Sequence, residues 1–136
     1  MRIMMLLLCC CIGQLAHAQT VVVVAKNSTI ESLDDQHVAN IFLARTNRFP
    51  NGEKANPIEL QNNQKKMYFY QEISGKTPSQ LNAYWTTIVF TGKGKPPKNY
   101  PAHDDIKISL KNQPGAITYL PLDQVTEDMK VVYTFP

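Results

Sequence analysis

The chain has 136 residues, 43% of them hydrophobic, and its 14 lysines and arginines exceed its 11 aspartates and glutamates by three. So small a net positive charge does not indicate a protein that binds nucleic acid or an anionic membrane through its overall charge. The length is enough for one domain with its own core and too short for two.

The N-terminus has the features of a secretory signal peptide. After a short basic start, residues 3–12 form an apolar run that is too short to span a bilayer, and Ala16-His17-Ala18 is a small-x-small cleavage site. We therefore predict that residues 1–18 are a cleaved signal peptide. Residues 19–136 are then a single domain located in the periplasm.

The chain's three cysteines, Cys9, Cys10 and Cys11, all lie in this segment. A lipoprotein signal that ends at one of them is the alternative interpretation, but a leucine or another cysteine precedes each, where a small residue is preferred. In either case residues 19–136 contain no disulfide and no cysteine metal ligand. No later apolar run is long enough for a transmembrane helix, so we expect no membrane-spanning segment after cleavage.

Four segments have the pattern of β-strands. Residues 20–25 contain four consecutive valines, which is typical of a strand buried on both faces, as in a parallel sheet covered by helices. Residues 56–60 form a short strand in which Pro57 indicates an edge strand or the first residue of a strand. The other two predicted strands are residues 116–120 and 130–135.

Three segments between these strands have helical patterns. Asp34 is expected to cap the first helix, and residues 65–73 form the second, which stops at Gly75. The third starts at Asp104 or Asp105, where acids suit both capping and the helix dipole, and ends near residue 112. This succession of strands and helices predicts an α/β fold.

A fourth helix, over residues 77–92, is the most completely marked element of the chain. Thr77 and Gln80 have capping-box spacing, Pro78 suits the first helical position, and Gly92 suits the end. Five apolar residues fall on one stripe at the helical period, namely Leu81, Tyr84, Trp85, Ile88 and Val89. We expect this helix to anchor the core.

Two polar segments directly follow predicted strands. Asn27, Ser28 and Thr29 follow the first strand, and Gln61, Asn62 and Asn63 follow the second. Ligands of α/β proteins bind at the carboxyl ends of strands. These six residues are therefore the candidate ligand-binding set.

Residues 91–98 form a basic loop rich in glycine and proline, which is either a contact for an anion or partner, or a solvated turn. His37 and His103 are far apart in the sequence, and no nucleophile has an identifiable base. We therefore expect no catalytic residues, no metal site and no cofactor, and predict that the protein is not an enzyme.

Three short motifs in this order give the chain a resemblance to a known family. They are Asn40-Ile41-Phe42-Leu43, residues 84–92, and Gln113-Pro114-Gly115-Ala116-Ile117-Thr118-Tyr119. Together they resemble small members of the superfamily of phosphate-binding proteins of ABC transporters. The resemblance implies a single lobe of a type II periplasmic-binding-protein-like fold, with a mixed, mostly parallel sheet flanked by helices.

The same resemblance implies a periplasmic solute-binding module whose ligand is phosphate or another small oxyanion, and no nucleic acid. The chain departs from the family pattern at Ala44 and Thr118, where the family has glycine. Residues 60–66 also lack the Gly, Ser and Thr residues with which full-length relatives hold phosphate at a helix N-terminus. The alternative is a non-catalytic accessory module that binds an envelope protein and has lost its ligand.

Overall fold

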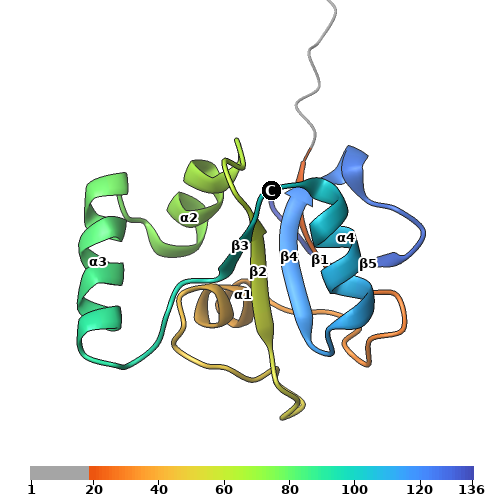
Figure 1. Cartoon of the computed structure of the whole chain (residues 1–136), viewed down its shortest axis with the longest axis horizontal. Coiled ribbons are helices and arrows are strands. Elements are labelled where there is room, and N and C mark those ends of the chain that lie inside the picture. Colours follow the sequence, from red (N-terminus) through yellow and green to blue (C-terminus); the bar gives the residue numbers. More distant parts are fainter. Residues whose placement is uncertain (1–18) are drawn as a thin grey trace, which may run out of the picture.

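A computed structural model of the chain describes residues 19–136, so the predicted signal peptide, residues 1–18, lies outside the described residues. The described chain forms a five-stranded mixed sheet with helices on both faces (Figure 1). The strand order is β3-β2-β4-β1-β5. The α/β fold with a mixed sheet that the sequence predicts is confirmed.

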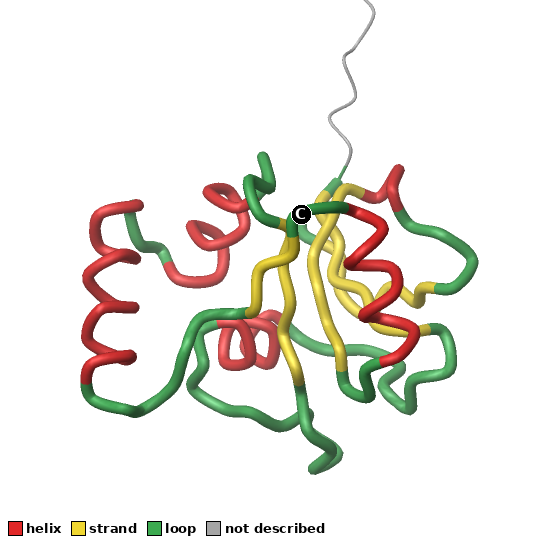
Figure 2. The backbone as a smooth tube through the Cα atoms, in the orientation of Figure 1, coloured by secondary structure: helices red, strands yellow, loops and turns green. Residues whose placement is uncertain are grey.

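The strands are β1 (Thr20–Ala25), β2 (Asn56–Leu60), β3 (Lys98–Tyr100), β4 (Ala116–Pro121) and β5 (Met129–Thr134). The helices are α1 (Asp35–Phe42), α2 (Lys66–Ser74), α3 (Pro78–Phe90) and α4 (His103–Asn112), and a 3₁₀ turn, η1 (Leu122–Gln124), follows β4. Figure 2 shows how the helices surround the strands. The sequence did not predict β3, because three residues are too few to form a recognisable pattern.

The four valines of β1 are fully buried, as their sequence predicts, but the direction of the strand differs from the prediction. β1 pairs antiparallel with both β4 and β5, whereas β2 pairs parallel with β3 and β4. Parallel pairs therefore do not predominate. A run of β-branched residues indicates burial on both faces, which helices provide for a strand of either direction.

Two apolar clusters cover the two faces of the sheet. On one face α1 and α2 contribute Phe42, Phe69 and Tyr70, which pack with Tyr119 of β4. On the other face α4 covers β1 and β2 with Ile106 and Leu110. Alternate residues of each strand face the two clusters, as the strand period requires.

Local sequence signals explain where the helices begin and end. The Asp34 side chain accepts a hydrogen bond from the His37 backbone N–H at 2.7 Å, so Asp34 caps α1 as predicted. Thr77 caps α3 through the Gln80 N–H at 3.2 Å. Gly75 ends α2 in the left-handed conformation, with φ of 66°.

β2 is an interior strand, so the alternative in which Pro57 marks an edge strand is wrong. Pro57 pairs with Ile117 of β4, and the pairing with β3 begins only at Ile58. Proline is compatible with this position because no strand lies on the other side of Pro57. The two helices α2 and α3 form the long crossover between β2 and β3.

The prediction that residues 77–92 anchor the core is wrong. Only Leu81 of α3 is buried, and Tyr84 and Trp85 are partly buried, while 54% of Val89 and 91% of Phe90 are exposed. α3 lies at the side of the molecule, away from the faces of the sheet (Figure 1). Helical spacing identifies an apolar stripe, but it does not identify a surface of the same chain that covers the stripe.

Candidate functional site

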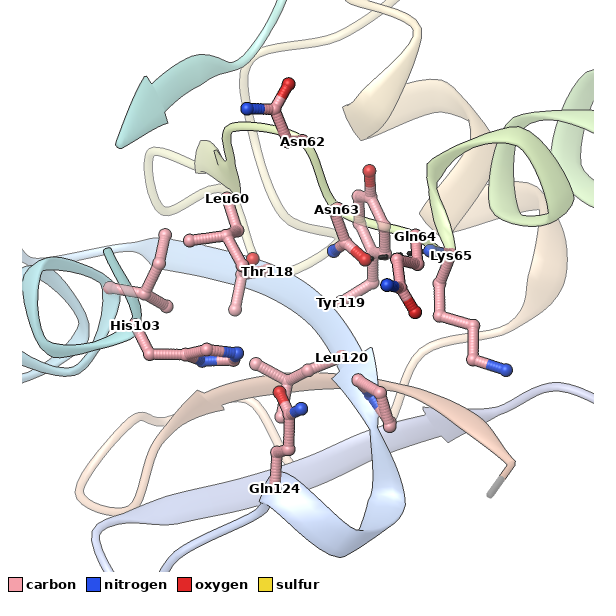
Figure 3. A pocket seen from close by; sticks show the side chains of 12 residues that line it. Leu60, Asn62, Asn63, Gln64, Lys65, His103, Thr118, Tyr119, Leu120 and Gln124 are labelled. Atoms are coloured by element: carbon pink, nitrogen blue, oxygen red, sulfur yellow. Dashed lines mark hydrogen bonds between the residues drawn. The ribbon is translucent and has the colours of Figure 1, made fainter. Parts of the chain in front are cut away.

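A hollow of about 320 Å³ lies at the carboxyl ends of β2 and β4 (Figure 3). Its walls come from the segment after β2, the first turn of α4, the second half of β4 and the 3₁₀ turn after β4. The polar side chains that line it are Asn62, Asn63, Gln64, Lys65, His103, Thr118 and Gln124. This combination of amide, hydroxyl and basic groups is suited to a small polar or anionic ligand.

Two helices begin at the hollow. Lys65 precedes α2 and His103 is the first residue of α4, and both side chains line the hollow. Neither helix has a side-chain hydrogen bond at its N-cap, which is Lys65 for α2 and Ala102 for α4. The partial positive charge of two helix N-termini therefore faces the same region.

Asp104 and Asp105 lie in the first turn of α4 but do not cap it, so the prediction that the helix starts at one of them is wrong.

The segment between β2 and α2 is held by its own turn. Asn62 has a left-handed backbone with φ of 60°, a conformation that asparagine tolerates better than most residues. The Asn63 side-chain oxygen accepts a hydrogen bond from the Lys65 N–H at 2.9 Å. This fixes the Asn63 side chain and leaves its amide hydrogens available to a ligand.

Thr118 is the buried polar residue that lines the hollow. The residue is only 1% exposed, and its hydroxyl makes no hydrogen bond to a side chain or backbone atom of residues 19–136. No fully enclosed side-chain polar atom lacks a partner in that range. At least a small part of the Thr118 hydroxyl is therefore accessible, and since the residue lines the hollow, a ligand oxygen there can accept its hydrogen bond.

A buried carboxylate lies close to the hollow, on the face of the sheet covered by α2. Glu59 is 2% exposed and accepts hydrogen bonds from the hydroxyls of Tyr119 at 2.8 Å and Tyr70 at 3.3 Å. Its other oxygen lies 3.4 Å from the Lys66 ammonium nitrogen. Burial, with the negative charge of Glu59 as the second cause, raises the pKa of both tyrosines.

This network assigns different roles to two adjacent lysines. Lys66 is paired with Glu59, whereas Lys65 makes no ion pair with another described residue and lines the hollow. The charge of Lys65 is therefore available to an anion. The charge of Lys66 instead compensates a buried carboxylate that would otherwise repel one.

The structure brings together only part of the predicted ligand-binding set. Asn62 and Asn63 line the hollow, but Gln61 is exposed, does not line it, and donates its backbone N–H to the Tyr100 carbonyl at 2.7 Å. Lys65, which follows them, does line it.

Asn27, Ser28 and Thr29 do not join this site. Because β1 is antiparallel to β4, the carboxyl end of β1 lies beside the amino end of β4. There these residues line a separate hollow of about 260 Å³. There the Thr29 hydroxyl donates to Glu53 at 2.8 Å and the Ser28 hydroxyl accepts from the Ile30 N–H at 3.1 Å. The structure therefore separates the six candidate residues into two places, because the residues after β1 could meet those after β2 only if β1 ran parallel to β4.

Sequence reasoning missed His103 and Gln124 as neighbours of the hollow, and noted Thr118 only as a departure from a glycine. His103 and Gln124 share a signal, since each lies a few residues beyond the carboxyl end of a strand, β3 and β4 respectively, whereas Thr118 lies within β4. Finding them required the order and direction of the strands.

Among the described residues, no group of His, Asp or Glu side chains is placed to hold a metal ion, and no helix is long and apolar enough to cross a membrane.

Solved structures with the same fold are phosphate-binding proteins by their descriptions. The first is described as a phosphate ABC transporter substrate-binding protein with bound phosphate from Clostridium perfringens. It is 13% identical to this chain with a TM-score of 0.62, and the match covers 85% of this chain and 44% of the Clostridium chain. An ABC-type phosphate transport receptor from Vibrio cholerae is 10% identical with a TM-score of 0.60, covering 85% and 45%. PstS from Borrelia burgdorferi is 11% identical with a TM-score of 0.58, covering 88% and 49%.

The predicted resemblance to phosphate-binding proteins of ABC transporters is thus confirmed at the level of the fold. The chain spans less than half the length of each of these three structures. It matches no known family model and no curated protein sequence.

Proposed function

We propose that residues 19–136 form a non-catalytic binding domain for a small oxyanion, with phosphate as the first candidate, in the hollow at the carboxyl ends of β2 and β4. The observation that carries the proposal is the Thr118 hydroxyl, a donor that makes no hydrogen bond within residues 19–136 and belongs to a buried residue lining the hollow. The uncapped starts of α2 and α4 and the unpaired Lys65 add positive potential at the same place.

The neighbouring structures support the choice of phosphate by their descriptions alone, since sequence identity is at most 14%. The proposed site differs from a glycine-rich phosphate cradle because it uses side-chain amides, a hydroxyl and a lysine. We also propose that the domain acts in the periplasm after removal of residues 1–18.

Isothermal titration of residues 19–136 with phosphate and with sulfate tests the proposal. Thr118→Val removes the hydroxyl at nearly constant volume, and Lys65→Met removes the charge at nearly constant length. Each is expected to weaken binding by about tenfold to a hundredfold, since a hydrogen bond to a charged group contributes about 1.5–3 kcal/mol. No binding of either anion by the unaltered domain at millimolar concentration contradicts the proposal.

Lys111→Met is the matched control, because Lys111 lines the separate hollow beside Asn27, Ser28 and Thr29. It is expected to leave the affinity unchanged. Weaker binding in Lys111→Met together with unchanged binding in Lys65→Met would instead place the anion in this separate hollow.

The second candidate function is an accessory module that binds an envelope protein. It is favoured by two exposed residues of α2, since Met67 is 55% and Tyr68 41% exposed in the first turn of that helix. A photo-crosslinking amino acid at position 67, with position 108 on α4 as the control, tests this in intact cells. A discrete crosslinked product at position 67 alone supports it, and no product at position 67 contradicts it.

A further inference from the structure

The C-terminal end of α3, which lies outside the core, forms a surface of its own. Trp85, Thr86, Val89 and Phe90 line a shallow, nearly apolar depression on α3. Phe90 is 91% exposed, the highest exposure among the large exposed hydrophobic residues of the described chain. α3 itself contains no charged residue. A stable fold gains nothing by exposing a phenylalanine and a valine at one helix end, so contiguous exposure of this kind indicates a docking surface.

The charge around this surface differs from that of the rest of the chain. Residues 73–103 contain four lysines and no aspartate or glutamate. The remainder of residues 19–136 contains nine basic and eleven acidic residues, so it is net negative. The small overall charge therefore conceals a concentration of positive charge on α3 and the loop that follows it.

The lysines flank both ends of α3. Lys93 and Lys95 are exposed in the loop directly after Phe90, and the Lys76 nitrogen lies 5.4 Å from the centre of the Tyr84 ring near the start of the helix. Glu72, the nearest acid in the preceding sequence, lines a different hollow together with Arg45. No acidic group on α3 or its flanking loops therefore opposes an anionic surface.

We propose that α3 and the loop after it bind the surface of an anionic phospholipid membrane. Phe90 and Val89 insert among the headgroups, next to the partly buried Trp85, while Lys93 and Lys95 contact lipid phosphates. Aromatic side chains favour that depth, and the lysine stems extend along apolar surface with their charges in the headgroup layer. Reversible attachment of this kind needs only a few inserted side chains together with a basic cluster.

A protein partner fits the surface less well. The exposed large hydrophobic residues of α3 are Val89 and Phe90 alone, whereas the buried centre of a stable protein interface needs a larger apolar cluster. A second copy of the chain would place the same acid-free basic surface against itself, and like charges facing each other oppose association. This inference goes beyond anion binding in the hollow and does not depend on it.

Sedimentation with lipid vesicles tests the proposal. The protein used is residues 19–136, because this segment contains both apolar clusters that cover the sheet. The domain is expected to bind vesicles of 70% phosphatidylethanolamine and 30% phosphatidylglycerol, and to bind phosphatidylcholine vesicles at least tenfold more weakly. Phe90→Ala should weaken binding about tenfold or more. Lys93→Ser with Lys95→Ser should weaken it and reduce its dependence on salt.

Trp85 is the chain's single tryptophan and provides a direct readout. Its fluorescence should shift to shorter wavelength on binding and should be quenched by brominated lipid. Ile108→Ala is the matched control, because Ile108 is a 57% exposed apolar residue on α4; it should bind vesicles as the unaltered domain does. Absence of vesicle binding, or unchanged binding in Phe90→Ala, overturns the proposal. A dimer that Phe90→Ala dissociates, without vesicle binding, overturns it in favour of an interface between copies.

Discussion

The hydroxyl of Tyr119 on β4 donates a hydrogen bond of 2.8 Å to the carboxylate of Glu59 on the neighbouring strand β2. Tyr119 also stacks on Phe69 of α2, with ring centroids 3.7 Å apart. One side chain therefore joins the apolar cluster to the only buried carboxylate of the described chain. The contact fixes the start of α2, and with it Lys65, relative to the carboxyl ends of the two strands.

Glu59→Ala is expected to destabilise the domain by about 2–4 kcal/mol, because two buried tyrosine hydroxyls lose their acceptor and each unsatisfied group costs about 1–3 kcal/mol. Glu59→Gln retains an acceptor oxygen and should cost clearly less. Urea unfolding followed by circular dichroism measures both values. Equal stability of Glu59→Ala and the unaltered domain would contradict the role assigned to this network.

The stability of the domain should fall as the pH rises above about 10. Burial first, and then the charge of Glu59, raises the pKa of Tyr70 above its ordinary value of 10.0, and that of Tyr119 in the same direction. Above pH 10 the unfolded chain releases these protons while the folded chain retains them, so unfolding becomes more favourable. Below that pH both states keep the protons and the contribution is fully present.

Urea unfolding at pH 8 and at pH 10.5–11.5 measures this effect. The double variant Tyr70→Phe with Tyr119→Phe should be less stable at pH 8, because Glu59 loses two donors, but its stability should decline less steeply with pH. Tyr68→Phe, which alters a tyrosine that is 41% exposed on the same helix, is the control and should keep the steep decline.

Gly115 is required by a close contact between two backbone segments. Its φ is 78°, and a Cβ atom there would lie 2.0 Å from the Lys54 carbonyl oxygen. Gly115→Ala should therefore cost more than the roughly 1–2 kcal/mol of a left-handed alanine alone, because the segment before β2 must also move. Gly52→Ala, with φ of 89° and no atom within 4 Å, is the matched control and should show only the smaller cost. Equal losses in the two variants, measured by thermal unfolding, would contradict this account.

The sequence predicts the elements well where local chemistry determines them. Asp34 and Thr77 are caps because their side chains accept N–H groups three residues later, and Gly75 ends a helix because it adopts positive φ cheaply. These interactions lie within a few residues, so a single sequence contains them. The motif around Pro114 and Gly115 likewise corresponds to a turn that the structure contains.

The candidate site was predicted only in part, because its location depends on strand direction. Asn62 and Asn63 follow β2 and reach the hollow, whereas Asn27 and Ser28 follow a strand that runs the other way. The run of valines in β1 is equally compatible with either direction. The burial of a strand can be predicted from its composition. The strands with which it pairs, and their direction, cannot, because they lie far away in the sequence.

α3 gives the sharpest test of how the structure differs from its sequence pattern. The amphipathic stripe predicts that residues along the whole helix support the core, whereas the structure buries only Leu81 and exposes Val89, and the neighbouring Phe90 is exposed as well. Leu81→Ala is therefore expected to destabilise the domain by about 2–4 kcal/mol, and Phe90→Ala to change its stability by less than about 0.5 kcal/mol. Urea unfolding of the two variants in the absence of lipid measures both. A loss of 2 kcal/mol or more in Phe90→Ala would show that the end of α3 packs on the domain, and it would remove the surface that the membrane proposal requires.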